Sequence, residues 1–178
     1  MTGLPAKIVA VHKALAAAQV PHAFGGALAL AWCTQRARGT IDIDLNIFVD
    51  NSLARGALEA LPDQVVWSEV DQALIERDGQ ARLWWDTTPV DLFLNTTEFH
   101  AQAAERAQWQ DFAGAKIPFL SCSDLAVFKA FFNRTKDWAD LEEMAAAGTL
   151  DLDRVLGVLV RHIGPTDTRI ERLQALPG

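Results

Sequence analysis

The sequence predicts an α+β fold, in which helices pack against a mixed β-sheet and a helical segment follows the sheet. Strand and helix patterns are interleaved through the first 120 residues, as is typical of a sheet covered by helices. Asp78-Gly79, between the segments 73–77 and 81–85, has the sequence of a two-residue β-hairpin turn, which excludes an all-parallel sheet. We therefore expect a core over residues 1–120 and a helical segment over 121–178, packed on the core as one compact unit.

Length and composition support a globular protein. The chain has 178 residues, 50% of them hydrophobic, which is enough for a real core. Its net charge of −7 argues against broad, nonspecific binding to nucleic acid. The first residues lack a signal-peptide pattern and no apolar run approaches membrane-spanning length, so we expect a cytoplasmic protein with no membrane partner.

The two cysteines, Cys33 and Cys122, have no paired CxxC spacing and lie in apolar or cap-like settings. In a reducing cytoplasm, such residues are typically structural thiols. We expect neither a disulfide nor a zinc site.

The first half of the chain contains predicted helices over 5–19 and from Asn51-Ser52 to Leu61, and predicted strands over 22–24, 65–67 and 90–94. The first helix has an apolar stripe at steps of four and three: Leu4, Ile8, Val11, Leu15 and Ala18.

The second half is expected to be mainly helical. Residues 97–110 suggest an exposed helix with a solvated His100, followed by an extended stretch at 117–120. Ser121 or Ser123 can cap the next helix. Beyond Gly148, two short helices are expected on either side of Gly164-Pro165.

The stretch from His22 to Asp50 has the features of a phosphate and metal site. Gly25-Gly26 ends a short strand before a helix, where the backbone can turn with positive φ and bring N–H groups close to an anion. Asp42 and Asp44, at i and i+2 of a strand, should share one face and reach one hard cation. Asp91 stands between two apolar residues and is expected to face the same side.

These residues resemble the signature of the DNA polymerase β-like nucleotidyltransferase superfamily, especially the small bacterial type related to abortive-infection toxins. The likeness lies in Gly25-Gly26, Arg38, Thr40 and 42–45. It extends to 89–94, similar to the strand with the third carboxylate, and to 124–141, similar to the helical segment after the core. The match covers roughly residues 5 to 147 in the right order. Ala27 departs from the family pattern, which often has a phosphate-binding serine or threonine there.

The resemblance implies a nucleotidyltransferase fold and the transfer of a nucleoside monophosphate from a nucleoside triphosphate to an acceptor. The acceptor is a small molecule, an RNA or a protein. Asp42, Asp44 and Asp91 would be catalytic and would hold Mg²⁺, with Mn²⁺ as the alternative; Asp91 holds a second metal or acts as base.

The resemblance also assigns residues to the nucleotide and its phosphates: Gly25, Gly26, Arg38, Lys129, Lys136 and Asp137. If the helix that begins at Asp124 is continuous, Lys129 and Lys136 share one of its faces. Taken alone, the charges over 134–140 describe an exposed helix face with ion pairs.

Three alternatives to a general nucleotidyltransferase stay open. One is a toxin-like protein that binds an antitoxin and acts on RNA or protein. Another is an antibiotic adenylyltransferase of the aminoglycoside type. The third is a catalytically silent scaffold, against which the three carboxylates argue, because clustered like charges are costly without a cation.

Overall fold

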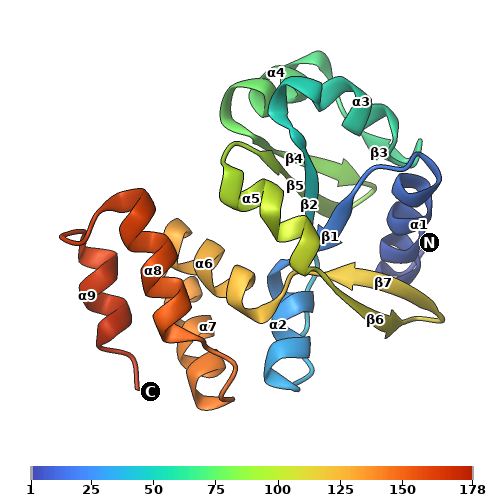
Figure 1. Cartoon of the computed structure of the whole chain (residues 1–178). Coiled ribbons are helices and arrows are strands. Elements are labelled where there is room, and N and C mark those ends of the chain that lie inside the picture. The colour runs from blue at the N-terminus through green and yellow to red at the C-terminus, as the bar shows by residue number, and fades with distance from the viewer. Residues whose placement is uncertain (1, 178) are drawn as a thin grey trace. The chain divides into compact units, whose positions relative to one another are not determined.

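The computed structural model describes residues 2–177, which divide into two compact units (Figure 1). The first unit contains the chain up to Gly26 together with Gly39–Leu120. The second contains Ala27–Arg38 together with the chain from Ser121 onward. The segment 27–38 therefore groups with the C-terminal helices.

The first unit is built on a mixed sheet, as predicted. Within residues 2–177, seven strands form this sheet in the order β3-β4-β5-β2-β1-β7-β6. Strand β2 is parallel to β5 and β1 to β7, and the other neighbours are antiparallel. The strands are β1 (His22–Phe24), β2 (Ile43–Asp50), β3 (Val65–Val66), β4 (Gln80–Trp85), β5 (Thr88–Asn95), β6 (Gln108–Phe112) and β7 (Ala115–Phe119).

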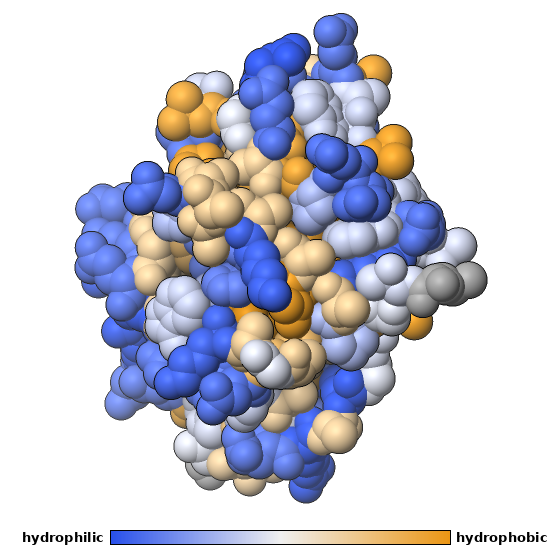
Figure 2. Space-filling model, turned by 90° about the vertical axis from the view of Figure 1, so that its right-hand side faces the viewer, coloured by the Kyte–Doolittle hydropathy of each residue, from blue (hydrophilic) through white to orange (hydrophobic). Residues whose placement is uncertain are grey.

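The helices of the first unit are α1 (Leu4–Ala17), α3 (Ala54–Glu59), α4 (Glu69–Asp78) and α5 (Glu98–Ala103), with 3-10 turns at Asn51–Leu53 and Ala104–Arg106. In α1, the centre of the predicted stripe is confirmed, since Ile8, Val11 and Leu15 are fully buried. Leu4 is half-buried, and Ala18, at the helix cap, is exposed. Figure 2 shows the face on the α1 side, where hydrophobic residues form a central area bordered by hydrophilic ones.

Alternation along the two central strands determines where the candidate aspartates lie. Ile43, Leu45 and Ile47 of β2 are fully buried, as are their direct partners in β5, Val90, Leu92 and Leu94, at 0 to 1% exposure. Because successive side chains of a strand point to opposite faces, Asp44 and Asp91 lie on the other face of the sheet.

Three predictions about the first unit are wrong. The helix expected over residues 97–110 ends earlier, and Gln108–Phe112 forms β6. Asp78-Gly79 is not a hairpin turn: Asp78 ends α4, and Gly79, with φ +75°, is the helix cap. The hairpin of this region is instead formed by the antiparallel strands β4 and β5, through a turn at Asp86-Thr87. His100 is not solvated but 5% exposed, because α5 turns it onto the sheet, where its Nε2 lies 3.1 Å from Asn46 Oδ1.

The second unit is helical, with most of α2 (Gly26–Thr34) and with α6 (Cys122–Phe132), α7 (Thr135–Ala146), α8 (Leu152–Ile163) and α9 (Thr168–Gln174). Ser121 caps α6 by accepting a hydrogen bond from the Asp124 amide. Gly164 ends α8, so the predicted separation of the last two helices is confirmed. Among residues 2–177, no helix combines the length and hydrophobicity needed to span a membrane.

Candidate functional site

The glycine turn lies directly against Asp44. The Gly25 amide donates a hydrogen bond to the Asp44 carbonyl at 2.9 Å. Gly26 has φ +54°, and a Cβ at this position would collide with the Asp44 carboxylate. Position 26 therefore requires glycine twice over, for its backbone conformation and for the space that the carboxylate occupies.

Asp44 and Asp91 are direct partners in the parallel pairing of β2 and β5. Paired residues of neighbouring strands point to the same side, so the two carboxylates share one face. Asp42 precedes β2 and is held by Thr40, whose hydroxyl donates to Asp42 Oδ1 at 2.8 Å. The structure thus brings the glycine turn and the three predicted aspartates together in the first unit.

Arg82 lies close to two of these carboxylates, although no pattern in the sequence pointed to it. It is the direct partner of Asp91 across β4 and β5. Its Nε and Nη2 donate to the two oxygens of Asp91, each at 2.7 Å, and Nη2 lies 3.9 Å from Asp42 Oδ2. The alternation of Arg82 with buried Leu83 places it on a strand face, but the cross-strand register that pairs it with Asp91 has no local sequence signal.

The electrostatics of Arg82 reflect this position. The pKa of its guanidinium is raised above its ordinary value, chiefly by the hydrogen bond to Asp91 and then by the charge of Asp91. The charges of Asp42 and Asp44 raise it further. All three carboxylates therefore act on a single positive charge.

The three aspartates fit a magnesium ion by their chemistry, since Mg²⁺ prefers carboxylate oxygens. The guanidinium among them shows that this part of the sheet accommodates a cation. In the arrangement described for residues 2–177, no three His, Cys, Asp or Glu side chains converge as a metal site. Both oxygens of Asp91 are instead directed at Arg82.

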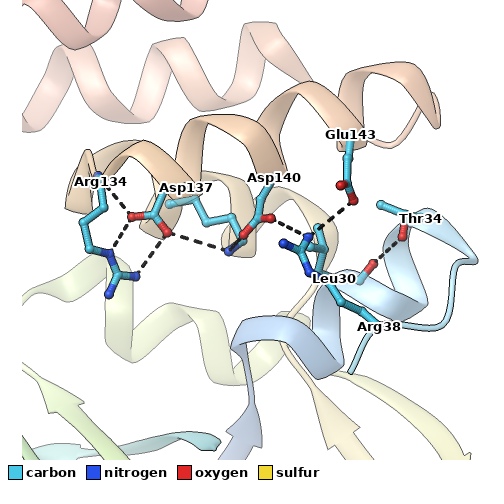
Figure 3. A network of polar contacts seen from close by, with 8 residues as sticks. Leu30, Thr34, Arg38, Arg134, Asp137, Asp140 and Glu143 are labelled. Atoms are coloured by element: carbon cyan, nitrogen blue, oxygen red, sulfur yellow. Dashed lines mark hydrogen bonds and ion pairs between the residues drawn. The ribbon is translucent and has the colours of Figure 1, made fainter. Parts of the chain in front are cut away.

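Three of the four residues of the second unit that were predicted to bind the nucleotide, Arg38, Lys129 and Asp137, belong to an ion-pair network (Figure 3). Lys129 Nζ lies 2.6 Å from Asp140 Oδ2 and 3.8 Å from Asp137 Oδ1. Arg38 also binds Asp140, at 2.5 Å. Arg134 donates to both oxygens of Asp137, at 2.7 and 3.1 Å. Two of the three positive charges assigned to phosphate, those of Arg38 and Lys129, are thus compensated by carboxylates of α7.

The arrangement of α6 and α7 corrects two expectations. The helix is not continuous: Asn133, in the left-handed conformation, ends α6, so Lys129 and Lys136 are on separate helices. Asp137 and Asp140 are not exposed helix charges but are 0% and 5% exposed. Lys136 is exposed.

Cys33 of α2 and Cys122 at the start of α6 form a disulfide, with Cα atoms 5.6 Å apart. The expectation of two free thiols is therefore wrong. The cysteines are 89 residues apart in sequence, and only the grouping of α2 with the C-terminal helices brings them together.

Comparison with solved structures identifies the fold. The chain is similar to ANT(2'')-Ia, described as an antibiotic-resistance factor, with a TM-score of 0.58 and 15% identity over 96% of each chain. An antigenic nucleotidyltransferase-like protein from Paracoccidioides brasiliensis has a TM-score of 0.49 and 14% identity, over 93% of this chain and 92% of that one. No protein-family model matches the chain, and no curated protein matches its sequence. The first likeness confirms the fold that the motifs predicted.

Proposed function

From the nucleotidyltransferase fold of this chain, we propose that the protein transfers a nucleoside monophosphate from a nucleoside triphosphate to an acceptor, with release of pyrophosphate. The observation that carries the proposal is the direct pairing of Asp44 with Asp91, beside a turn that only glycine can form. A fold alone hosts many functions, so these residues, and not the fold, support the proposal.

The aspartates would divide the chemistry between them. Asp42 and Asp44 would hold Mg²⁺, or Mn²⁺ as the alternative, and Thr40 fixes the carboxylate of Asp42. A bound divalent cation would neutralise the charge that develops on the phosphates. Asp91 would hold a second ion or accept the proton of the acceptor hydroxyl. Either role requires Asp91 to exchange its hydrogen bonds to Arg82.

The nucleotide would be bound by the glycine turn and by the residues assigned to phosphate. The Gly25 amide is engaged with the Asp44 carbonyl, so the backbone contact to phosphate rests on Gly26. Arg38 and Lys129 would have to share their charge between phosphate and Asp140. Lys136 is exposed and could reach a phosphate directly. Asp137 is fully buried, so its role would be to hold Lys129 and Arg134 in place.

A second candidate is transfer to a cationic antibiotic of the aminoglycoside type. It is favoured by the likeness to ANT(2'')-Ia over 96% of both chains. The net charge of −7 also favours a cationic acceptor over a polyanionic one.

The test is a nucleotide-transfer assay with each of the four labelled triphosphates, Mg²⁺, and either a cell extract or a panel of aminoglycosides. Wild type should label an acceptor. Asp42→Asn and Asp44→Asn should lower transfer by orders of magnitude, because loss of the cation removes several kcal/mol of transition-state stabilisation. Asp111→Asn, at an exposed position on β6, is the control and should transfer normally. Normal transfer by Asp44→Asn would overturn the assignment.

A further inference from the structure

Arg82 is a cation built into the carboxylates that the proposed function assigns to Mg²⁺. Its guanidinium engages both oxygens of Asp91 at 2.7 Å and lies 3.9 Å from Asp42 Oδ2. The sheet fixes this position, because Arg82 and Asp91 are opposite each other in the register of β4 and β5. Both carboxylate oxygens of Asp91, which a hard cation would need as ligands, thus accept hydrogen bonds from Arg82.

We propose that Arg82 is a resident counter-ion, which competes with the divalent cation for these carboxylates and thereby sets the affinity of the site for metal. The inference rests on the proposed function, since that function places the metal at Asp42, Asp44 and Asp91. A bidentate arginine–carboxylate pair is among the stronger hydrogen-bonding arrangements in proteins. When no metal is bound, Arg82 also supplies hydrogen bonds to the Asp91 carboxylate, which is only 18% exposed to water.

The exposure of Arg82 allows it to leave. Its side chain is 53% exposed, so a guanidinium released from Asp91 can be hydrated. Removing an arginine from a buried pair would leave an unpaired charge in the interior, which is costly. When Arg82 leaves, the group at risk is Asp91, which is 18% exposed, and a divalent cation on the same oxygens would compensate its charge.

The test is direct metal binding by the purified full-length protein, in the absence of nucleotide and acceptor. Mn²⁺ is the probe, and the free ion is measured by electron paramagnetic resonance. Arg82→Ala should bind Mn²⁺ with a Kd at least about tenfold lower than wild type, equivalent to about 1.4 kcal/mol. Arg77→Ala is the matched control, because Arg77 is an exposed arginine of the same unit that pairs with Asp78; its Kd should equal that of wild type.

Thermal unfolding gives a second readout. In EDTA, Arg82→Ala should melt below wild type, because Asp91 loses its hydrogen-bonded counter-ion and Asp42 a nearby positive charge. Added Mg²⁺ should raise its melting temperature by more than it raises that of wild type. If Arg82→Ala does not fold, Arg82→Gln removes the charge while keeping an amide donor, and its Kd should also fall.

An unchanged or higher Kd in the folded Arg82 variant would overturn the proposal, as would the absence of Mn²⁺ binding by every variant. Transfer by wild type together with an unchanged Kd in Arg82→Ala would reject the role of Arg82 and leave the proposed function standing. Tighter Mn²⁺ binding by Arg82→Ala with no transfer by wild type would support Arg82 and count against the function.

Discussion

Lys129 and Asp140 form an ion pair inside the helical unit, with Nζ and Oδ2 2.6 Å apart and side chains only 8% and 7% exposed. Asp140 also binds Arg38, and Lys129 lies 3.8 Å from Asp137. The lysine therefore compensates acidic groups that cannot be solvated where they are. Removing one partner of a buried pair leaves the other charge uncompensated, which costs far more than the loss of an exposed pair.

We predict that Lys129→Met lowers the free energy of unfolding by about 3 kcal/mol without nucleotide. This loss is at the low end of the range for breaking a buried ion pair. Asp140 still pairs with Arg38, and Asp137 with Arg134. Urea unfolding measures the change. Lys136→Met, at an exposed position, is the control and should stay within about 0.5 kcal/mol of wild type.

The same variants separate stability from nucleotide binding. Adding a triphosphate with Mg²⁺ should raise the melting temperature by mass action, and this rise should shrink in Lys129→Met if the lysine contacts phosphate as the family resemblance implies. A variant that is destabilised but shows the full rise would make Lys129 a structural residue only.

At the glycine turn, Gly26→Ala should lower both stability and transfer. The left-handed conformation at φ +54° costs an alanine about 1–2 kcal/mol, and its Cβ would displace the Asp44 carboxylate. Gly56→Ala is the control, because its Cβ meets nothing within 4 Å in α3. This variant should gain about 0.4–1 kcal/mol. Equal stability of the two variants, measured by urea unfolding, would contradict the geometry of the turn.

The Cys33–Cys122 disulfide should stabilise the helical unit. It closes a loop over a sequence separation of 89 residues, so its reduction should lower the free energy of unfolding by about 2–5 kcal/mol. Thermal unfolding with and without dithiothreitol measures the effect. A Cys33→Ala/Cys122→Ala protein should melt at one temperature in both conditions. Wild type that melts identically in both would show that the bond contributes nothing.

Patterns contained within one element were predictable from the sequence. The apolar stripe of α1, the Ser121 cap and the break at Gly164-Pro165 each depend on a few neighbouring residues. The hairpin predicted at Asp78-Gly79 was wrong because the same dipeptide suits both a hairpin turn and the end of a helix. The capping box of Ser68 and Asp71 at the start of α4 was the signal for the second choice.

Relationships between distant elements were not predictable in this way. Arg82 joins the candidate site through strand register, and the cysteines meet through the packing of α2 with α6. His100 looked like a solvated residue of a polar, alanine-rich stretch. Its burial follows from the way α5 lies on β2, which no periodicity within α5 specifies.

His100 gives a prediction for pH dependence. Burial lowers the pKa of its imidazole from 6.5 to about 4, so the folded protein keeps it neutral while the unfolded chain takes up a proton at higher pH. The stability that this neutral histidine permits is fully present above pH 6.5 and is lost as the pH falls from 6.5 towards 4. At about 1.4 kcal/mol for each unit of pKa difference, the loss amounts to about 3 kcal/mol.

Urea unfolding at pH 6.5 and pH 4 measures this loss, and His100→Gln isolates it. Burial also lowers the pKa of His12 and His22, so both proteins should lose stability in acid, and the difference between them belongs to His100. The glutamine variant should start lower at pH 6.5, because it gives up a packed ring beside Phe48, and should then lose about 3 kcal/mol less than wild type. Parallel pH profiles for the two proteins would show that His100 titrates alike in the folded and unfolded chain, which its burial on the sheet does not allow.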